Sequence, residues 1–291
     1  MTPIEQYVAV PGGRIFTLQW GEGPLLVFTH ATGMCARVYA QLLAPLADRF
    51  RIVALDARGH GRTDLEAAPG RIPSDWALYR QDLVALVDAL GGGPVLLAGH
   101  SFGATASFEA AVETPGLARA VCLIDPPFIP SDHVAAYRAA RDAGHSPNPM
   151  ADQAERRRGT FDSREAARSS YQGRGVFSGW PDQALDAYLD GGLLPDGKGV
   201  RLACAPGWEA TSFRGVSTTF ADSLALADFP FTLLAASEGS TVPEAEEPRI
   251  RANSNAHFRR FPGTGHFLPV THPDLVRPYL ALLGSGTFPD R

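Results

Sequence analysis

The pentapeptide Gly99-His100-Ser101-Phe102-Gly103 has the form G-x-S-x-G and is the most informative stretch of this chain. The apolar run before it, residues 94–98, predicts a buried strand, and the alanine-rich run after it, residues 104–112, predicts a helix. A serine on such a sharp turn needs small neighbours, because the strained backbone brings its two flanks close together. The two glycines leave that room, so the segment predicts a serine exposed at the tip of a strand-to-helix turn.

The composition is that of a globular protein of 291 residues, long enough for one large α/β domain with an insertion. Hydrophobic residues make up 45% and charged residues 20%, which permits a sizeable core. The formal net charge of −5 argues against nucleic acid as a partner, since phosphate-binding surfaces are basic. We see no signal peptide or membrane span, and three scattered cysteines predict a reducing cytoplasm without disulfides or a metal site: Cys35, Cys122 and Cys204.

Strand and helix patterns alternate along both ends of the chain. Residues 4–10 and 14–19 predict a hairpin around Pro11-Gly12-Gly13. The further strands are predicted at residues 24–29, 51–55, 94–98, 118–124, 231–236 and 257–261, and the helices between them include residues 39–47 and 75–90. This alternation predicts an α/β fold whose mostly parallel central sheet is flanked by helices on both faces.

Residues 127–228 break the alternation. They are rich in Ala, Arg, Gly and Pro, with scattered aromatic residues, poor strand signals and moderate helical signals. We therefore predict a core formed by residues 1–126 and 229–291, and an inserted, mainly helical cap over residues 127–228. The basic stretch Arg156-Arg157-Arg158 within it predicts a solvated helix face.

A substrate pocket is expected where this cap covers Ser101, because ligand sites are concave and mostly apolar. Six side chains are predicted to wall it: His30, Phe128, Phe177, Trp180, Trp208 and Phe267. The ring of His30 is also expected to brace its own loop.

A serine hydroxyl needs a general base to become a nucleophile, and the base needs an orienting partner. His266 fits the base, because it lies in a small-residue loop between the last predicted strand and the last helix. An oxyanion hole needs two backbone N–H groups that point at one spot. We assign them to Phe102, directly after the serine, and to Thr32 in the loop after an early strand, with Ala31 as the alternative to Thr32.

The chain resembles the α/β-hydrolase fold superfamily in its cap-bearing branch. The matching segments are residues 30–33, 56–61, 99–103 and 265–269, in the family's order. The resemblance implies a Ser-His-acid triad that uses no metal and no organic cofactor, and a structural role for the loop at residues 56–61. Ala31 departs from the family, whose members more often have His-Gly at this point.

The triad acid is left open by the sequence. Most family members carry an Asp shortly after the strand at residues 231–236, but Ser240 stands at that place here. Some members place the acid after the preceding strand, where this chain has Asp125. Asp125 is our first assignment, Glu238 is the rival, and the absence of any functional acid is the third alternative.

These observations predict a serine-dependent hydrolase that cleaves a small to medium, largely apolar ester or lactone through an acyl-enzyme. Ser101 argues against epoxide hydrolases and haloalkane dehalogenases of this fold, which use an Asp nucleophile. The alternatives are a carbon–carbon bond hydrolase of ring-cleavage diketones and a small-molecule receptor without turnover. We expect a small-molecule substrate as the partner, no nucleic acid or membrane, and a possible homodimer.

Overall fold

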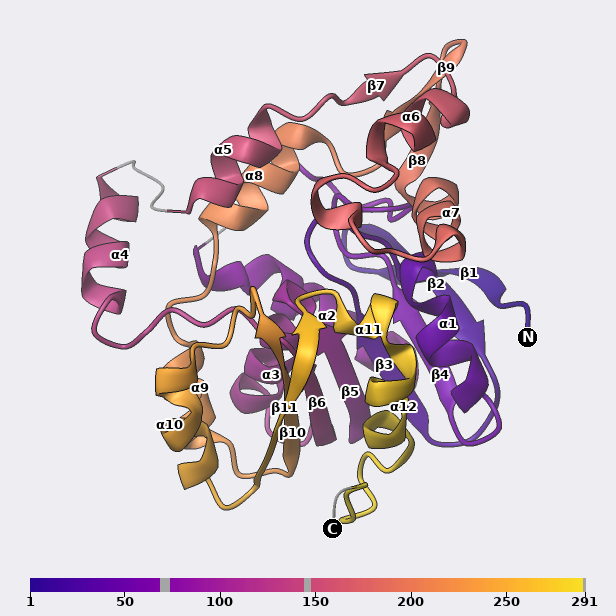
Figure 1. The fold of residues 1–291 in the computed structure, drawn as a ribbon. Coiled ribbons are helices and arrows are strands. Elements are labelled where there is room, and N and C mark those ends of the chain that lie inside the picture. Colours follow the sequence, from indigo (N-terminus) through magenta and orange to yellow (C-terminus); the bar gives the residue numbers. More distant parts are fainter. Residues whose placement is uncertain (69–73, 144–147, 290–291) are drawn as a thin grey trace.

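A central sheet of eight strands organises the residues that the computed structural model describes, 1–68, 74–143 and 148–289 (Figure 1). The strand order is β1-β2-β4-β3-β5-β6-β10-β11. The pairs β1–β2 and β2–β4 are antiparallel, and the remaining pairs are parallel. The strands are β1 (Ile4–Val10), β2 (Gly13–Trp20), β3 (Leu25–Thr29), β4 (Arg51–Leu55), β5 (Val95–His100), β6 (Ala118–Ile124), β10 (Phe231–Glu238) and β11 (Ala256–Gly265).

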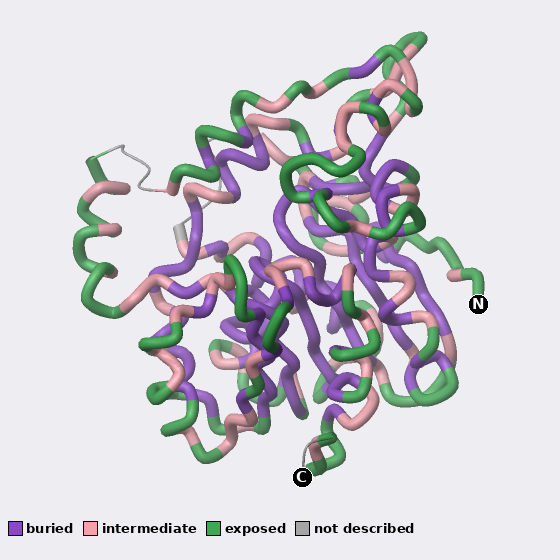
Figure 2. The backbone as a smooth tube through the Cα atoms, in the orientation of Figure 1, coloured by how far each residue is buried: buried purple, intermediate pink, exposed green. Residues whose placement is uncertain are grey.

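Helices cover both faces of this sheet because alternate side chains of each strand enter opposite hydrophobic layers. In β3, Leu26 and Phe28 belong to one layer and Val27 belongs to the other. The first layer includes α1 (Ala40–Leu43), α11 (Leu268–Thr271) and α12 (Pro273–Ala281), and the second includes α2 (Ala77–Ala89), α3 (Phe102–Glu113), α9 (Phe220–Leu226) and α10 (Glu247–Ala252). The buried strands in Figure 2 lie between these layers, and the predicted fold class is confirmed.

Two predicted helices have different bounds in the structure. The predicted helix at residues 39–47 is three short pieces, η1 (Ala36–Tyr39), α1 and η2 (Ala44–Leu46), and Pro45 near their end lacks the N–H that a continuous helix requires. The helix predicted from residue 75 begins at Ala77, because Asp75 and Trp76 adopt left-handed φ angles of 62° and 54°. The Asp75 carboxylate instead accepts the backbone N–H of Thr218 at 2.7 Å.

The segment between β6 and β10 lies over the carboxyl ends of the parallel strands (Figure 1). It contains the helices α4 (Val134–Asp142), α5 (Pro149–Glu155), α6 (Arg164–Tyr171), α7 (Asp182–Gly192), α8 (Pro206–Arg214) and α9. It also contains an antiparallel sheet, β7 (Thr160–Phe161), β8 (Leu193–Asp196) and β9 (Gly199–Leu202), which the sequence did not predict. Strands of two to four residues are too short to show an alternating pattern.

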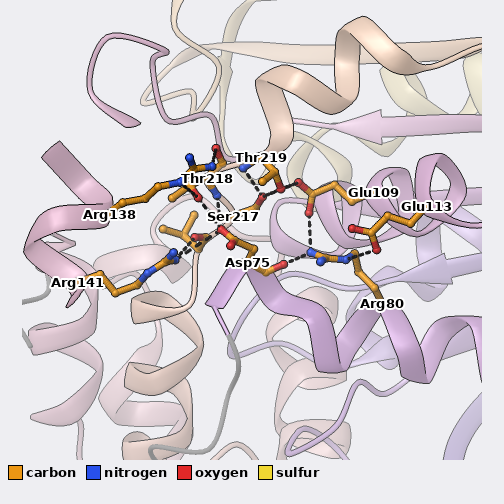
Figure 3. Close-up of polar contacts among 10 residues, drawn as sticks. Asp75, Arg80, Glu109, Glu113, Arg138, Arg141, Ser217, Thr218 and Thr219 are labelled. Atoms are coloured by element: carbon orange, nitrogen blue, oxygen red, sulfur yellow. Dashed lines mark hydrogen bonds and ion pairs between the residues drawn. The ribbon is translucent and has the colours of Figure 1, made fainter. Parts of the chain in front are cut away.

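A buried carboxylate fixes the returning end of this segment to the core (Figure 3). Glu109 of α3 forms an ion pair with Arg80 at 3.0 Å and accepts hydrogen bonds from the hydroxyls of Ser217 at 2.5 Å and Thr219 at 2.9 Å. Burial raises the pKa of the Glu109 carboxyl, and these hydrogen bonds oppose that rise. Because α3 starts directly after Ser101, the segment is anchored to the helix that carries the serine turn.

Among the described residues, no helix is long and apolar enough to cross a membrane. The same residues contain no group of three or more His, Cys, Asp or Glu side chains arranged to hold a metal ion.

Candidate active site

Ser101 sits on a strained turn between β5 and α3, with φ 54° and ψ −127°. A Cβ atom added to Gly99 would lie 2.5 Å from the backbone of Gly103, and one added to Gly103 would lie 2.4 Å from the carbonyl oxygen of His30. Only glycine fits at both positions, which is the physical reason for the G-x-S-x-G pattern. The turn presents Ser101 to a cavity above the sheet.

Asp125 and His266 meet beside this turn. Asp125 follows β6, is fully buried and has a φ of 45°, while His266 follows β11. The His266 Nδ1 lies 2.6 Å from the Asp125 carboxylate. Because a carboxylate only accepts, Nδ1 donates in this contact, and Nε2 is the ring nitrogen left to take a proton.

The end of β10 and the loop after it hold the Asp125 carboxylate. Its oxygens accept the Ala236 N–H at 2.9 Å, the Ser240 hydroxyl at 2.6 Å and the Thr241 N–H at 3.1 Å. Burial alone would raise the pKa of this carboxyl, but the hydrogen bonds from His266, Ser240 and Ala236 outweigh it and hold the pKa below its usual value. Ser240, at the position where most members of the family carry the acid, therefore donates to an acid on the neighbouring strand.

The rival acid makes no such contact. Glu238 is at the end of β10, where it pairs with Gly265, but its side chain is exposed and forms no hydrogen bond or ion pair with another residue that the structure describes. The structure joins His266 to Asp125 and places His266 with Ser101 in the lining of one cavity, at the carboxyl ends of the strands.

Two buried histidines shape the loop after β3. His30 accepts the Ala57 N–H through Nε2 at 2.9 Å and donates from Nδ1 to the Ala31 carbonyl at 2.8 Å. His60 accepts the Gly33 N–H through Nε2 at 3.0 Å. Burial lowers the pKa of His60 to about 4 and that of His30 well below its usual value, so both rings are neutral at pH 7.

A hydrogen-bond chain joins this loop to the backbone of His266. His100 donates from Nε2 to the His266 carbonyl at 2.9 Å, so its Nδ1 accepts the Tyr39 hydroxyl at 2.7 Å. The Tyr39 oxygen in turn accepts the Ala31 N–H at 3.1 Å. Burial first, and nearby His266 second, lower the pKa of His100 to about 3, which keeps the ring neutral and the direction of the chain fixed.

The Ala31 N–H is already bonded to Tyr39 in this hydrogen-bond chain, so Ala31 is excluded as an oxyanion donor. The Gly33 N–H is likewise bonded to His60. The N–H groups of Thr32 and Phe102 have no hydrogen-bond acceptor among the described residues. Of the three predicted donors, Thr32 and Phe102 therefore remain available.

A cavity of about 680 Å³ opens above Ser101 and His266, between the core and the inserted segment. Of the six side chains predicted to wall a pocket, Phe177 and Phe267 line this cavity. The prediction is wrong for the other four, which lie outside the lining: His30, Phe128, Trp180 and Trp208.

Packing explains why these four lie outside. Both ring nitrogens of the buried His30 are bonded within its own loop. Trp208 packs on Gly59 and donates from its indole nitrogen to the Arg58 carbonyl at 3.0 Å. Phe128 packs against Phe220 with ring centroids 5.4 Å apart, and Trp180 lies 5.1 Å from each of the two lining phenylalanines.

The predicted solvated face at residues 156–158 is wrong for Arg157. Helix α5 ends at Glu155, and the Arg157 side chain turns inward to bond both carboxylate oxygens of Glu209, at 2.7 and 2.5 Å, and the Tyr188 hydroxyl at 3.1 Å. Arg157 and Glu209 both line the cavity. No pattern in the sequence distinguishes Arg157 from its exposed neighbours Arg156 and Arg158.

Comparison with known proteins places this geometry in a family. The model of the alpha/beta hydrolase fold family matches residues 24–273. A 2-(acetamidomethylene)succinate hydrolase from Mesorhizobium japonicum is 26% identical over 258 residues, which cover 88% of this chain and 86% of the relative. A non-heme chloroperoxidase from Streptomyces lividans is 27% identical over 287 residues, covering 92% and 95%.

Solved structures agree on the fold. A crystal structure of E-2-(acetamidomethylene)succinate hydrolase matches with a TM-score of 0.77 at 24% identity, and the match covers 94% of this chain and 96% of that one. The chain therefore belongs to the alpha/beta hydrolase fold family, and its relatives indicate a hydrolase.

Proposed function

We propose that this chain is a serine-dependent hydrolase that cleaves a small to medium, largely apolar ester or lactone. Ser101 is the nucleophile, His266 the general base and Asp125 the group that orients and balances His266. The observation that carries the proposal is the 2.6 Å contact between Asp125 and His266 beside the strained Ser101 turn. A buried, ionised acid on Nδ1 is what a histidine needs to accept a proton at Nε2.

The reaction proceeds in two halves. The Ser101 hydroxyl attacks the carbonyl carbon while its proton moves to His266, and the Thr32 and Phe102 N–H groups bind the oxygen that becomes negative. His266 then gives that proton to the departing alcohol, which leaves an acyl group on Ser101. Water attacks the acyl group with His266 again as base, and the acid product leaves with Ser101 restored.

The cavity supports a substrate of modest size. Its volume of about 680 Å³ falls within the usual range for small-molecule sites, and Phe177 and Phe267 give it aromatic walls. Residues 127–228 act as the cap in this proposal, because they form the part of the cavity wall opposite Ser101.

A second candidate is hydrolysis of a different bond at the same site, including the carbon–carbon bond of a ring-cleavage diketone. The Mesorhizobium relative favours keeping it, because its name describes an acetamidomethylene succinate and not an ester. The same serine, base and oxyanion donors serve any bond that breaks through a tetrahedral intermediate.

Hydrolysis of a panel of 4-nitrophenyl esters and lactones by the wild type and Ser101→Ala tests the proposal. We expect Ser101→Ala to lower kcat by about 10⁴-fold or more on the best substrate. The proposal would be contradicted if Ser101→Ala kept most of the wild-type activity. Activity on vinylogous diketones that far exceeds activity on aryl esters would select the second candidate, and saturable binding without product would indicate a receptor.

A further inference from the structure

The Arg157 guanidinium is a cation in the cavity wall whose hydrogen-bond donors already bind other side chains of the protein. Its Nη1 bonds both oxygens of Glu209, and its Nη2 lies 3.1 Å from the Tyr188 hydroxyl and 3.5 Å from the Tyr171 hydroxyl. The side chains of Arg157 and Glu209 are 22% and 7% exposed, so water screens their charges little.

The same ion pair lies against the proposed oxyanion loop. A Cβ atom added to Gly33 would lie 2.4 Å from the Glu209 carboxylate and 3.4 Å from Arg157 Nη1. Gly33 follows Thr32, whose N–H is a proposed oxyanion donor. A substrate held there has the Arg157–Glu209 pair directly beside its reacting end.

The charges facing the cavity decide what that end can carry. Arg157 and Glu209 cancel, and Asp125 is bonded to His266. Arg174 also lines the cavity and forms no ion pair with another described residue, but it is exposed, so water screens its charge. A substrate carboxylate that reached Arg157 would place a second anion beside a cation that Glu209 already neutralises, and the two carboxylates would repel each other.

We infer that Glu209 determines specificity by occupying Arg157, so that the site takes acyl groups that are uncharged and discriminates against those bearing a carboxylate. This inference rests on the proposed function and names the substrate class of that site. Glu209 is a specificity-determining residue here and takes no part in bond breaking. The name of the Mesorhizobium relative contains a succinate, so the inference predicts a preference unlike the one that name implies.

Two matched ligands test the inference through the ratio of their affinities and of their kcat/KM values. Monomethyl adipate and methyl adipamate are nearly equal in size and differ by one negative charge. Calorimetry on Ser101→Ala, alone and combined with Glu209→Gln or Arg157→Gln, gives binding without turnover. Mono(4-nitrophenyl) adipate and 4-nitrophenyl adipamate, which differ by the same single charge, give kcat/KM with an intact serine. Asp186→Asn removes one carboxylate from the cap surface, where it bonds Arg164 and Arg168, and serves as the control.

The parent proteins are Ser101→Ala in the binding assay and the wild type in the kinetic assay. We expect the affinity of the first and the kcat/KM of the second to be about tenfold or more higher for the amide than for the carboxylate. Glu209→Gln should lower that preference by about tenfold, Arg157→Gln should raise it, and Asp186→Asn should leave it unchanged. Loss of a purely structural contact would weaken the binding of both ligands alike and leave the ratio of their affinities constant.

Three results would overturn the inference: an equal or greater preference for the carboxylate in the parent proteins, an unchanged ratio in folded Glu209→Gln, or no binding of either ligand. A protein that binds with the expected ratio but hydrolyses no ester would contradict the proposed function instead.

Discussion

The loops around Ser101 and the inserted segment above them are held by opposite kinds of polar contact. Neutral imidazoles of His30, His60 and His100 bond backbone groups around Ser101. The inserted segment is joined by arginine–carboxylate contacts, of which Arg157–Glu209 is the most buried and Arg168–Asp186 is half exposed.

This difference shows how polar contacts position groups in each region. A neutral ring has one donor and one acceptor, so His30 and His60 each fix two backbone groups, and His100 fixes one backbone carbonyl and the Tyr39 hydroxyl. A guanidinium reaches several partners on different elements, and Arg157 alone joins α6, α7 and α8. The first arrangement should be sensitive to acid, and the exposed ion pairs of the second should be sensitive to salt.

The largest expected effect is at the acid. Asp125→Asn should lower kcat by about 10⁴-fold, because His266 loses its negative partner and its correct tautomer. Glu238→Gln should leave kcat unchanged, since the Glu238 side chain is exposed and the carboxylate that bonds His266 is that of Asp125. Steady-state kinetics on one ester compares the two variants, and a large loss in Glu238→Gln would contradict the assignment.

The acid sensitivity of the imidazole network comes next. His60 has a pKa of about 4 in the folded protein against 6.5 when unfolded, so its stabilising contribution is complete above pH 6.5 and is lost as pH falls toward 4. Between pH 7 and pH 4 this amounts to ~3 kcal/mol. The free energy of unfolding of His60→Gln should therefore fall by that much less than the wild type over this range.

Denaturant unfolding at several pH values measures this difference, and His272→Gln is the matched control because His272 is exposed. If the free energy of unfolding of His60→Gln and of the wild type changed with pH in parallel, the expected acid sensitivity of the histidine contacts would be contradicted.

A smaller effect is expected for the chain from Ala31 to His266. Tyr39→Phe removes the hydroxyl that bonds Ala31 and His100, which should let the oxyanion loop shift. We expect kcat to fall by about 30-fold with KM nearly constant, less than the loss of an oxyanion donor itself. A rise in KM at constant kcat would show that Tyr39 shapes the pocket and does not position the donor.

The smallest effect concerns the surface of the inserted segment. Asp186→Asn should lower the free energy of unfolding by about 0.5 kcal/mol or less, and the difference should vanish in high salt, because exposed ion pairs are weak and screened. Denaturant unfolding with and without added salt measures it. A salt-independent loss of several kcal/mol would mean that the surface pairs hold the segment as firmly as the buried one.

The core was predictable because its signals are local. Gly99 is required by contacts with Gly103 and Ala104, within a few residues of Ser101, and the buried strands are continuous apolar runs. The small-residue loop at His266 also carries its own signal. By contrast, the partner of Ser240 is Asp125, which is 115 positions away, so its donor role is visible only when β6 and β10 pair.

The cavity wall was less predictable for the same reason. Trp208 and Phe177 are both aromatic residues of the inserted segment, yet one packs on Gly59 and the other faces the cavity. Arg157 finds Glu209 across 52 positions, and a run of three arginines gives no hint of which one turns inward. Sequence patterns identify which residues are apolar or charged, but tertiary packing decides which of them face the substrate.

Labelling with a fluorophosphonate, followed by intact-mass spectrometry and peptide mapping, tests most directly whether Ser101 is an activated nucleophile. The account predicts one label per chain, on Ser101, and no label in folded His266→Ala. A folded wild type that stays unlabelled, or a label on another residue, would contradict it.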